Sequence, residues 1–316
     1  GTLAAPPGPT ERLVLLVNGR PSGDARIGAG GTDWSIQPLL TGPDGPVTVQ
    51  LQLVDGAGNA GAASIPFQAT LDSTAPTTVP LLTALIDDRG PRQGPLAQGA
   101  VTDDDTPLLQ GTLSGPLASG ETLEVLANGV VIGTVVRLGP GNGWSLPLLL
   151  PQGPGTAISL TARVVDAAGN AGRAAGARRL VVDTVAPAMA TTITAVIDDH
   201  GARQGAAAPG DWISDRTPRI LGSLSAPAGA GEVVQVLNGD TVLGSAVLAA
   251  DRRSWGFTAT VPAAVAALTL RARVVDAAGN SGALPADHPL QVDSLAPTVD
   301  RKSTRLNSSH ANISYA

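Results

Sequence analysis

One stretch of sequence occurs three times along the chain and constrains the fold more than any other feature. In the middle of the chain it reads LTARVVDAAGNAG, ending at Gly172, followed shortly by RLVVDTVAP, ending at Pro187. Its first aspartate falls at Asp55, Asp166 and Asp276, at steps of 111 and 110 residues, and its second falls at Asp72, Asp183 and Asp293 at the same steps. A spacing that two independent markers share indicates tandem copies of one structural unit.

Length and composition agree with several small globular units. A chain of 316 residues is typical of two or three domains, and 43% hydrophobic with 15% charged residues is typical of globular protein. The 39 glycines and 26 prolines suit short strands joined by many turns. No run of about 18 apolar residues occurs, so we expect no membrane insertion. Without an initiator methionine or a signal peptide, the chain is expected to be an internal fragment.

Charge and motifs argue against several classes of function. The net charge is −6, and it becomes −9 without the basic residues of the last sixteen, which argues against nucleic acid as a partner. Cysteine is absent, so small secreted β domains would need core area or metal for stability. No HExxH, paired-cysteine or GxSxG pattern is present. We therefore expect no enzymatic activity and no small-molecule substrate.

Alignment of the copies sets the expected boundaries. Residues 1–19 align with 111–129 and 222–239, so residues 1–76 form a partial repeat that lacks its first strand. Residues 77–187 and 188–297 are complete repeats, each ending in a proline. We call these repeats one, two and three. Residues 298–316 follow none of the repeat markers, and we expect them to be a disordered or artefactual tail without a functional role.

Within each repeat the apolar residues alternate with polar ones. Val47, Val49, Leu51 and Leu53 alternate with Thr48, Gln50 and Gln52, as in an antiparallel strand packed on one face. Asn-Gly pairs at 18–19, 128–129 and 238–239 predict type I′ hairpins. In repeat three we expect seven strands, near 191–197, 219–224, 233–237, 241–248, 255–261, 268–275 and 290–292. The pattern predicts an all-β fold of tandem immunoglobulin-like antiparallel sandwiches with about seven strands each.

Three of the four tryptophans also follow the repeat. Trp34, Trp144 and Trp255 are spaced by 110 and 111 residues. A surface platform for a ligand is one interpretation, and a core anchor is the one we favour, because a small sandwich needs one large filler. Trp212 falls outside the pattern and receives no role.

The aspartates are the remaining candidates for chemistry. The possible metal ligands are Asp87, Asp88, Asp103, Asp104 and Asp183 in repeat two, and Asp198, Asp199, Asp215, Asp276 and Asp293 in repeat three. Aspartates often only cap turns, and that reading stays open. The alternative is calcium, which takes six to eight oxygen ligands. If repeats stack end to end, the acids of repeat two face Asp276, and we expect Asp88, Asp104 and Asp183 to bind calcium there.

The combined set IDD, TDDxTP, NG, W, VxDxAGN and VDxxAP resembles the bacterial immunoglobulin-like repeat of giant secreted adhesins and biofilm surface proteins. Repeat two carries it at 86–88, 102–107, 128–129, 144, 164–170 and 182–187. Repeat three departs from it, because Ser214 and Arg216 replace acids.

The resemblance implies a non-enzymatic extender, located outside the cell or on its surface. Neighbouring repeats of the same chain would be its partners, and structural calcium at the junctions would stiffen a rod that presents a distal adhesive domain. The alternative is an accessory carbohydrate- or ligand-binding module of a secreted multidomain protein. That class would need exposed aromatic residues, and only 2% of the chain is aromatic.

Overall fold

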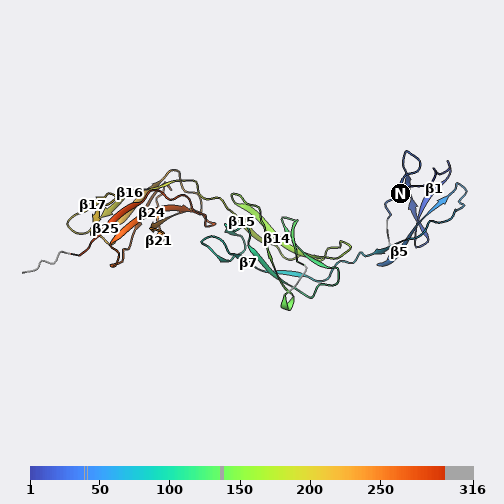
Figure 1. Ribbon diagram of the computed structural model, residues 1–316, viewed down its shortest axis with the longest axis horizontal. Coiled ribbons are helices and arrows are strands. Elements are labelled where there is room, and N and C mark those ends of the chain that lie inside the picture. The colour runs from blue at the N-terminus through green and yellow to red at the C-terminus, as the bar shows by residue number, and fades with distance from the viewer. Residues whose placement is uncertain (39, 41, 136–138, 296–316) are drawn as a thin grey trace, which may run out of the picture.

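The computed structural model describes residues 1–38, 40, 42–135 and 139–295, and the expected tail and the boundary at Pro297 lie outside these residues. The described chain is built from strands, and its helical structure is one 3-10 turn, η1 (Pro140–Asn142). No helix in the described ranges is long and apolar enough to cross a membrane. Figure 1 shows three groups of strands that follow one another along the longest axis of the molecule.

Repeat two folds into two sheets. One sheet has the order β13 (Gly143–Pro147), β10 (Leu108–Leu113), β7 (Pro80–Asp87) and β8 (Gly94–Pro95). The other has the order β12 (Val130–Val135), β11 (Thr122–Ala127), β14 (Thr156–Val165), β15 (Arg178–Val182) and β9 (Ala100–Thr102). All pairings are antiparallel except that of β15 with β9.

Repeat three has the same architecture. Its first sheet has the order β17 (Gly205–Ala207), β16 (Thr191–Asp198), β19 (Arg219–Leu224), β23 (Ser254–Thr258) and β22 (Val247–Leu248). Its second has the order β18 (Trp212–Ile213), β25 (His288–Val292), β24 (Ala267–Val275), β20 (Val233–Asn238) and β21 (Thr241–Ser245). The prediction of an all-β fold of immunoglobulin-like sandwiches is confirmed.

The alternation of apolar residues explains the packing of the two layers. On β14, Ile158, Leu160, Ala162 and Val164 are buried, whereas the residues between them are partly exposed. They meet Leu85 and Leu109 of the facing sheet in one hydrophobic cluster. A side-chain period of two thus places one face of each sheet in the core and the other toward solvent.

The repeated tryptophans are core residues in the complete repeats, as predicted. Trp144 is 5% exposed and Trp255 is 3% exposed. Each indole lies against a glycine, Gly111 or Gly222, where a Cβ atom would overlap the ring. The indole therefore packs directly against the glycine in the core of each complete repeat, and a larger residue in place of the glycine would displace the ring.

Repeat one has a single large sheet. Its order is β2 (Arg20–Asp24), β1 (Arg12–Val17), β5 (Gly45–Val54) and β6 (Phe67–Leu71), and β3 (Arg26–Ile27) pairs with β4 (Trp34–Ser35). By the repeat spacing, β2, β1, β5 and β6 match β12, β11, β14 and β15 of the second sheet of repeat two, and β4 matches β13 of its first sheet. Trp34 is only partly buried, because no described strand of repeat one matches β7 above it.

Three details differ from the sequence-based expectation. The segment expected as one strand over 241–248 is divided into β21 and β22, which belong to different sheets. The short strands β17 and β18 were not anticipated, and β18 pairs parallel with β25. Asn18 and Asn128 have positive φ, as type I′ turns require, but Asn238 pairs with Thr241 and the turn shifts to the next two residues.

Candidate functional site

The DxAGN loop after the sixth main strand of each repeat is held rigid by its own aspartate. In repeat two, Asp166 Oδ1 accepts hydrogen bonds of 2.9 Å from the backbone N–H groups of Ala168 and Asn170. Asp166 Oδ2 accepts a third, also 2.9 Å, from the Asn170 side chain. That side-chain bond and the backbone bonds hold the pKa of Asp166 below its ordinary value. The loop is a preformed turn.

The same asparagine reaches the preceding repeat. Asn170 Nδ2 donates a 3.0 Å hydrogen bond to the backbone carbonyl of Asp72, at the end of repeat one. Asn280 Nδ2 donates one of 2.7 Å to the carbonyl of Asp183, at the end of repeat two. A primary amide carries two hydrogens, so one serves the loop and the other crosses the junction. The two junctions are therefore built alike.

A glycine beside this loop makes a second contact that occurs at both junctions. A Cβ atom at Gly172 would lie 2.5 Å from the carbonyl oxygen of Pro76, and one at Gly282 would lie 2.8 Å from that of Pro187. The equivalent Gly61 of repeat one has its nearest neighbour, the carbonyl of Leu53, at 3.6 Å. Only glycine permits the linking proline to approach this closely.

The second junction has an additional contact that sequence reasoning missed. Arg92, in the turn between β7 and β8, donates a 2.6 Å hydrogen bond from Nη1 to the carbonyl of Ala277. Side-chain atoms of Pro91 and Arg92 also lie 3.4–3.7 Å from the position of a Cβ at Gly279. The recurrence of this turn as HGARQ, with Arg203 in the place of Arg92, was the signal in the sequence.

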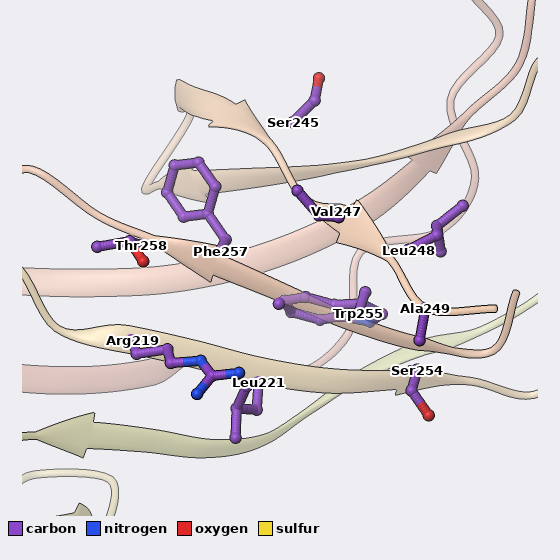
Figure 2. Close-up of a pocket in the computed structure, with 11 residues that line it drawn as sticks. Arg219, Leu221, Ser245, Val247, Leu248, Ala249, Ser254, Trp255, Phe257 and Thr258 are labelled. Atoms are coloured by element: carbon purple, nitrogen blue, oxygen red, sulfur yellow. The ribbon is translucent and has the colours of Figure 1, made fainter. Parts of the chain in front are cut away.

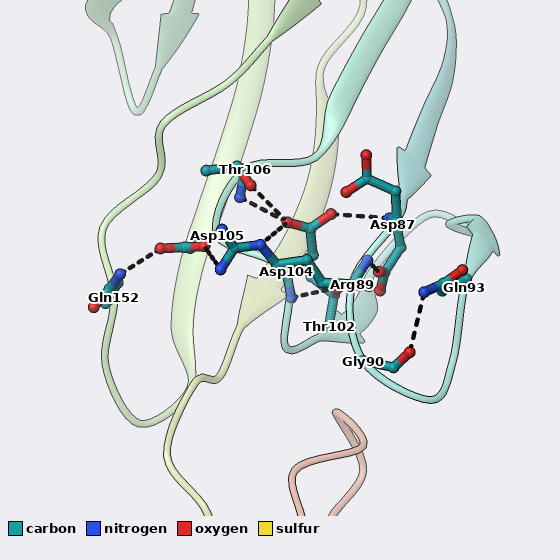
Figure 3. Close-up of polar contacts among 10 residues, drawn as sticks. Asp87, Arg89, Gly90, Gln93, Thr102, Asp104, Asp105, Thr106 and Gln152 are labelled. Carbon is teal, nitrogen blue, oxygen red and sulfur yellow. Dashed lines mark hydrogen bonds and ion pairs between the residues drawn. The ribbon is translucent and has the colours of Figure 1, made fainter.

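The aspartates of repeat two gather at the pole that faces this junction, and most of them order the backbone there (Figure 3). Asp104 is fully buried; its Oδ2 accepts a 3.1 Å bond from the N–H of Asp88, and its Oδ1 accepts a 2.7 Å bond from the N–H of Thr106. Asp87 is also buried and accepts a hydrogen bond from the Thr102 hydroxyl. Asp88 itself is exposed.

An arginine supplies positive charge to this pole, which sequence reasoning also missed. Arg89 Nη1 lies 3.1 Å from Asp105 Oδ1, and Arg89 Nε lies 4.0 Å from Asp104 Oδ1 (Figure 3). Asp105 also accepts a hydrogen bond from Gln152. Two of the buried carboxylates therefore have a counter-charge from the protein.

Among the described residues, Asp103 lacks the contact with Arg89 that Asp104 and Asp105 have, although Asp105 Oδ1 is likewise without a hydrogen bond there. Asp103 Oδ1 is buried and has no hydrogen-bond partner within the described part of the chain. Burial raises the pKa of Asp103, and the negative charges of Asp87, Asp104 and Asp276 raise it further. Asp276 belongs to the DxAGN loop of repeat three, so one of the charges that raise this pKa lies across the junction.

The predicted calcium ligands are not all brought together. Asp183 Oδ1 accepts a hydrogen bond from the N–H of Val185, as in an ordinary turn. The backbone carbonyl of Asp183 accepts the hydrogen bond from Asn280 Nδ2. Among the described residues no three His, Cys, Asp or Glu side chains are arranged to hold a metal ion. The orphaned Asp103 oxygen is nevertheless a donor of the type that calcium prefers.

The corresponding pole of repeat three carries less negative charge. Asp198 Oδ2 accepts a hydrogen bond from the N–H of Ser214, and Asp215 Oδ1 accepts one from the N–H of Thr217. Asp215 Oδ2 is buried and has no hydrogen-bond partner among the residues that the structure describes. Asp199 and Asp293 are exposed. Arg216 replaces an acid and donates to Ser294 Oγ at 2.7 Å.

A groove of about 460 Å³ in repeat three bears on ligand binding (Figure 2). Leu221, Val247, Leu248, Trp255 and Phe257 contribute its apolar lining. The indole of Trp255 is almost fully covered, so it offers no free face on which a sugar ring could stack. Trp212 is 60% exposed, but it lies on β18 rather than in this groove.

Comparison with known proteins found similar chains among solved structures. No family model matches the chain, and no curated protein matches it. Among solved structures, a Ca²⁺-stabilized adhesin with which an Antarctic bacterium binds ice is 18% identical over 92% of this chain and 67% of that one, with a TM-score of 0.31. The Bacteroides ovatus protein SGBP-B, in complex with a mixed-linkage heptasaccharide, is 9% identical over 93% and 64%, with a TM-score of 0.21. The Ig1-2 module of Drosophila DLAR is 12% identical over 68% and 98%, also with a TM-score of 0.21. At identities and TM-scores this low, the immunoglobulin-like assignment rests on the sheets of the chain itself.

Proposed function

We propose that this chain is a run of non-enzymatic extender repeats from a large bacterial cell-surface or secreted adhesin. In this proposal each repeat is a separate domain, with boundaries near Pro76, Pro187 and Pro297, and the repeats form a rod that presents a distal adhesive domain. The partners are the neighbouring repeats of the same chain, and the location is extracellular.

The observation that supports this proposal most directly is the repetition of one junction. An asparagine side chain meets a carbonyl of the preceding repeat at both junctions, and a glycine admits the linking proline at both. A contact found at a single junction would fix the relation of those two domains only. A contact used at every step gives each domain the same relation to the one before it, which is how solenoid and tandem-repeat proteins extend in one direction.

Calcium enters the proposal at the junction between repeats two and three. Asp103 would hold the ion, with Asp87, Asp104 and Asp276 close enough for their charges to act on it. The charges of Asp87, Asp104 and Asp276 act unfavourably on an ionised Asp103, and a divalent cation would relieve this repulsion and join the two repeats. Arg89 already forms an ion pair with Asp105, so Asp103 is the carboxylate that a bound cation would stabilise most.

The alternative function is an accessory ligand-binding module, and the groove beside Trp255 is the observation in its favour. The extender is the stronger proposal, because the groove offers little aromatic surface, whereas the junction contacts recur. Binding of the chain to an immobilised glycan series, lost in Phe257→Ala and kept in Phe67→Ala, would favour the alternative.

Small-angle X-ray scattering tests the rod. Gly172→Ala with Gly282→Ala introduces a Cβ at both junctions, whereas Gly61→Ala places one where the nearest atom is at ordinary contact distance. We expect the double variant to change the maximum dimension and the flexibility of the full chain, and Gly61→Ala to leave both unchanged. Equal profiles for all three proteins would show that the junctions do not set the shape.

A further inference from the structure

Trp212 lies outside the repeat pattern of the other tryptophans, and its indole is exposed. The tryptophans of the repeat pattern are buried in both complete repeats, whereas Trp212 is 60% exposed. Ile213, the next residue of β18, is only 2% exposed, so the two side chains point to opposite faces of the strand. The indole of Trp212 therefore stands on the outer face of the second sheet of repeat three.

The residues around Trp212 differ from their counterparts in repeat two. Trp212 pairs in parallel with Gln291 of β25, and the equivalent pair in repeat two is Val101 with Val181. Asp211, just before Trp212, stands where repeat two has an alanine. Three neighbouring apolar side chains of repeat two are thus replaced in repeat three by an indole, a carboxamide and a carboxylate. This combination is typical of a binding surface rather than of packing.

The backbone holds this surface in place. Both residues that flank Gln291 in β25 are buried, so the Gln291 side chain points outward, as the indole of Trp212 does. The N–H of Gln291 donates a 2.9 Å hydrogen bond to the carbonyl of Asp211, and the N–H of Asp293 donates one of 3.0 Å to that of Ile213. Because β18 is fixed to β25 on both sides of Trp212, a ligand would meet a surface that is already ordered.

A small polar pocket adjoins the indole. It has a volume of about 30 Å³, and its lining includes Asp198, Arg203, Gln204, Asp211 and Trp212. Arg203 Nη2 lies 3.8 Å from Asp211 Oδ2, which also accepts a 3.0 Å hydrogen bond from the N–H of Ala208. The Arg203 side chain is 79% exposed, so its guanidinium can also reach a ligand. A space of this size suits one water molecule or one hydroxyl group.

We propose that this surface of repeat three binds a neutral sugar. A pyranose ring presents a face of C–H groups and a rim of hydroxyl groups, and the negative face of an indole attracts the C–H groups. The Gln291 amide and the pair of Arg203 and Asp211 can donate and accept hydrogen bonds, as hydroxyl groups require. The ring would lie on Trp212, with one hydroxyl group in the small pocket beside it.

Two observations favour a sugar over a peptide. β18 lies at the edge of its sheet but has only two residues, too few for an extended peptide to add a strand. Charged and amide side chains line the pocket beside the indole, whereas a helix or a proline-rich segment needs an apolar groove. The inference is independent of the extender function, and the site is separate from the groove beside Trp255, which β22 and β23 mainly form.

Saturation-transfer difference NMR of the full chain tests the site with three neutral hexasaccharides, of glucose, of mannose and of N-acetylglucosamine. We expect saturable transfer to the ring C–H protons of at least one of them. Trp212→Val and Gln291→Val install the residues that repeat two carries, so the fold should persist, which thermal melting checks. Trp212→Val should abolish the transfer, and Gln291→Val should weaken binding about two- to tenfold through the loss of a hydrogen bond. Phe257→Ala, in the separate groove, should bind like the wild type.

Three outcomes would overturn the proposal. Absence of transfer to all three saccharides would show that the surface does not bind neutral sugars. Transfer that persists in Trp212→Val, or that is lost in Phe257→Ala, would place the binding elsewhere. Saturable binding of a proline-rich decapeptide, without binding of any saccharide, would show that the exposed indole takes a peptide instead.

Discussion

Asn280 donates a 2.7 Å hydrogen bond from its side-chain amide to the backbone carbonyl of Asp183, in the preceding repeat. The second hydrogen of the same amide serves Asp276, 2.9 Å away in its own loop. One side chain therefore couples the shape of a loop to the placement of a neighbouring repeat. A net contribution of about 0.5–1.5 kcal/mol is typical of such a bond, which is enough to bias an orientation without making it permanent.

The core tryptophans should be essential for folding. Trp144→Ala removes a buried aromatic side chain, and we expect a loss of about 3–5 kcal/mol of unfolding free energy, measured by urea denaturation. Because a domain usually has only about 5–15 kcal/mol in total, repeat two could lose most of its stability. Trp212→Ala changes an exposed side chain and should stay within about 0.5 kcal/mol of the wild type. Similar losses in both variants would contradict the core assignment.

The lowered pKa of Asp166 predicts how the stability of repeat two changes as the pH falls. Its folded-state pKa is held below the ordinary value by the Asn170 side chain and the loop amides. A lowered pKa contributes stability above the unfolded pKa of about 3.9, and this contribution disappears as the pH falls through the folded value. The stability difference between wild type and Asp166→Asn should therefore shrink between pH 6 and pH 2. Asp88→Asn, at an exposed side chain outside this loop, is the control; a pH-independent difference for Asp166→Asn would contradict the argument.

The pH dependence of stability that comes from Asp103 should have the opposite sign to that from Asp166, and an Asp103 variant should show whether calcium binds. Its raised pKa means that the folded chain holds the proton more tightly, so its ionisation destabilises the fold as the pH rises past about 3.9. Without calcium, Asp103→Asn should therefore raise the melting temperature at pH 7. With calcium at about 100-fold above its dissociation constant, the wild type should gain about 2.7 kcal/mol, and the variant should lose most of that gain.

The calcium experiment also has a clear negative result. If calcium changes neither protein and the variant is more stable under both conditions, Asp103 is a buried acid without a cation. Asp199→Asn, at an exposed acid of repeat three, should respond to calcium like the wild type.

The sequence predicted the strands well because their signal is local. A period of two identifies β14 and β24 without knowledge of their neighbours. The division of 241–248 between two sheets was missed, because alternation continues through a strand that changes sheets. The parallel pairing of β18 with β25 joins residues about 80 positions apart, and a short strand carries no signal for such a partner.

The acidic residues of the candidate site could be named from the sequence, but not the arginines that contact them or the neighbouring repeat. The acids that gather at the pole were identified, yet Arg89 and Arg92 were not. A long flexible side chain takes its partner from three-dimensional proximity rather than from spacing. The glycines at the junctions could not be separated from Gly61 either, because all three stand in the same motif, and the described residues place a proline carbonyl beside Gly172 and Gly282 but not beside Gly61.

The central claim is that the junction asparagines fix each repeat relative to the one before it. The absence of cysteine allows clean double labelling, so nitroxides can be attached at Thr83→Cys and Thr194→Cys, which are exposed and equivalent positions in repeats two and three. Pulsed electron–electron double resonance then measures the distribution of distances between them. We expect one narrow distribution that broadens in Asn280→Ala and remains narrow in Asn59→Ala, where the same loop has no described repeat before it. A distribution that is equally broad in all three proteins, or unchanged by Asn280→Ala, would contradict the claim.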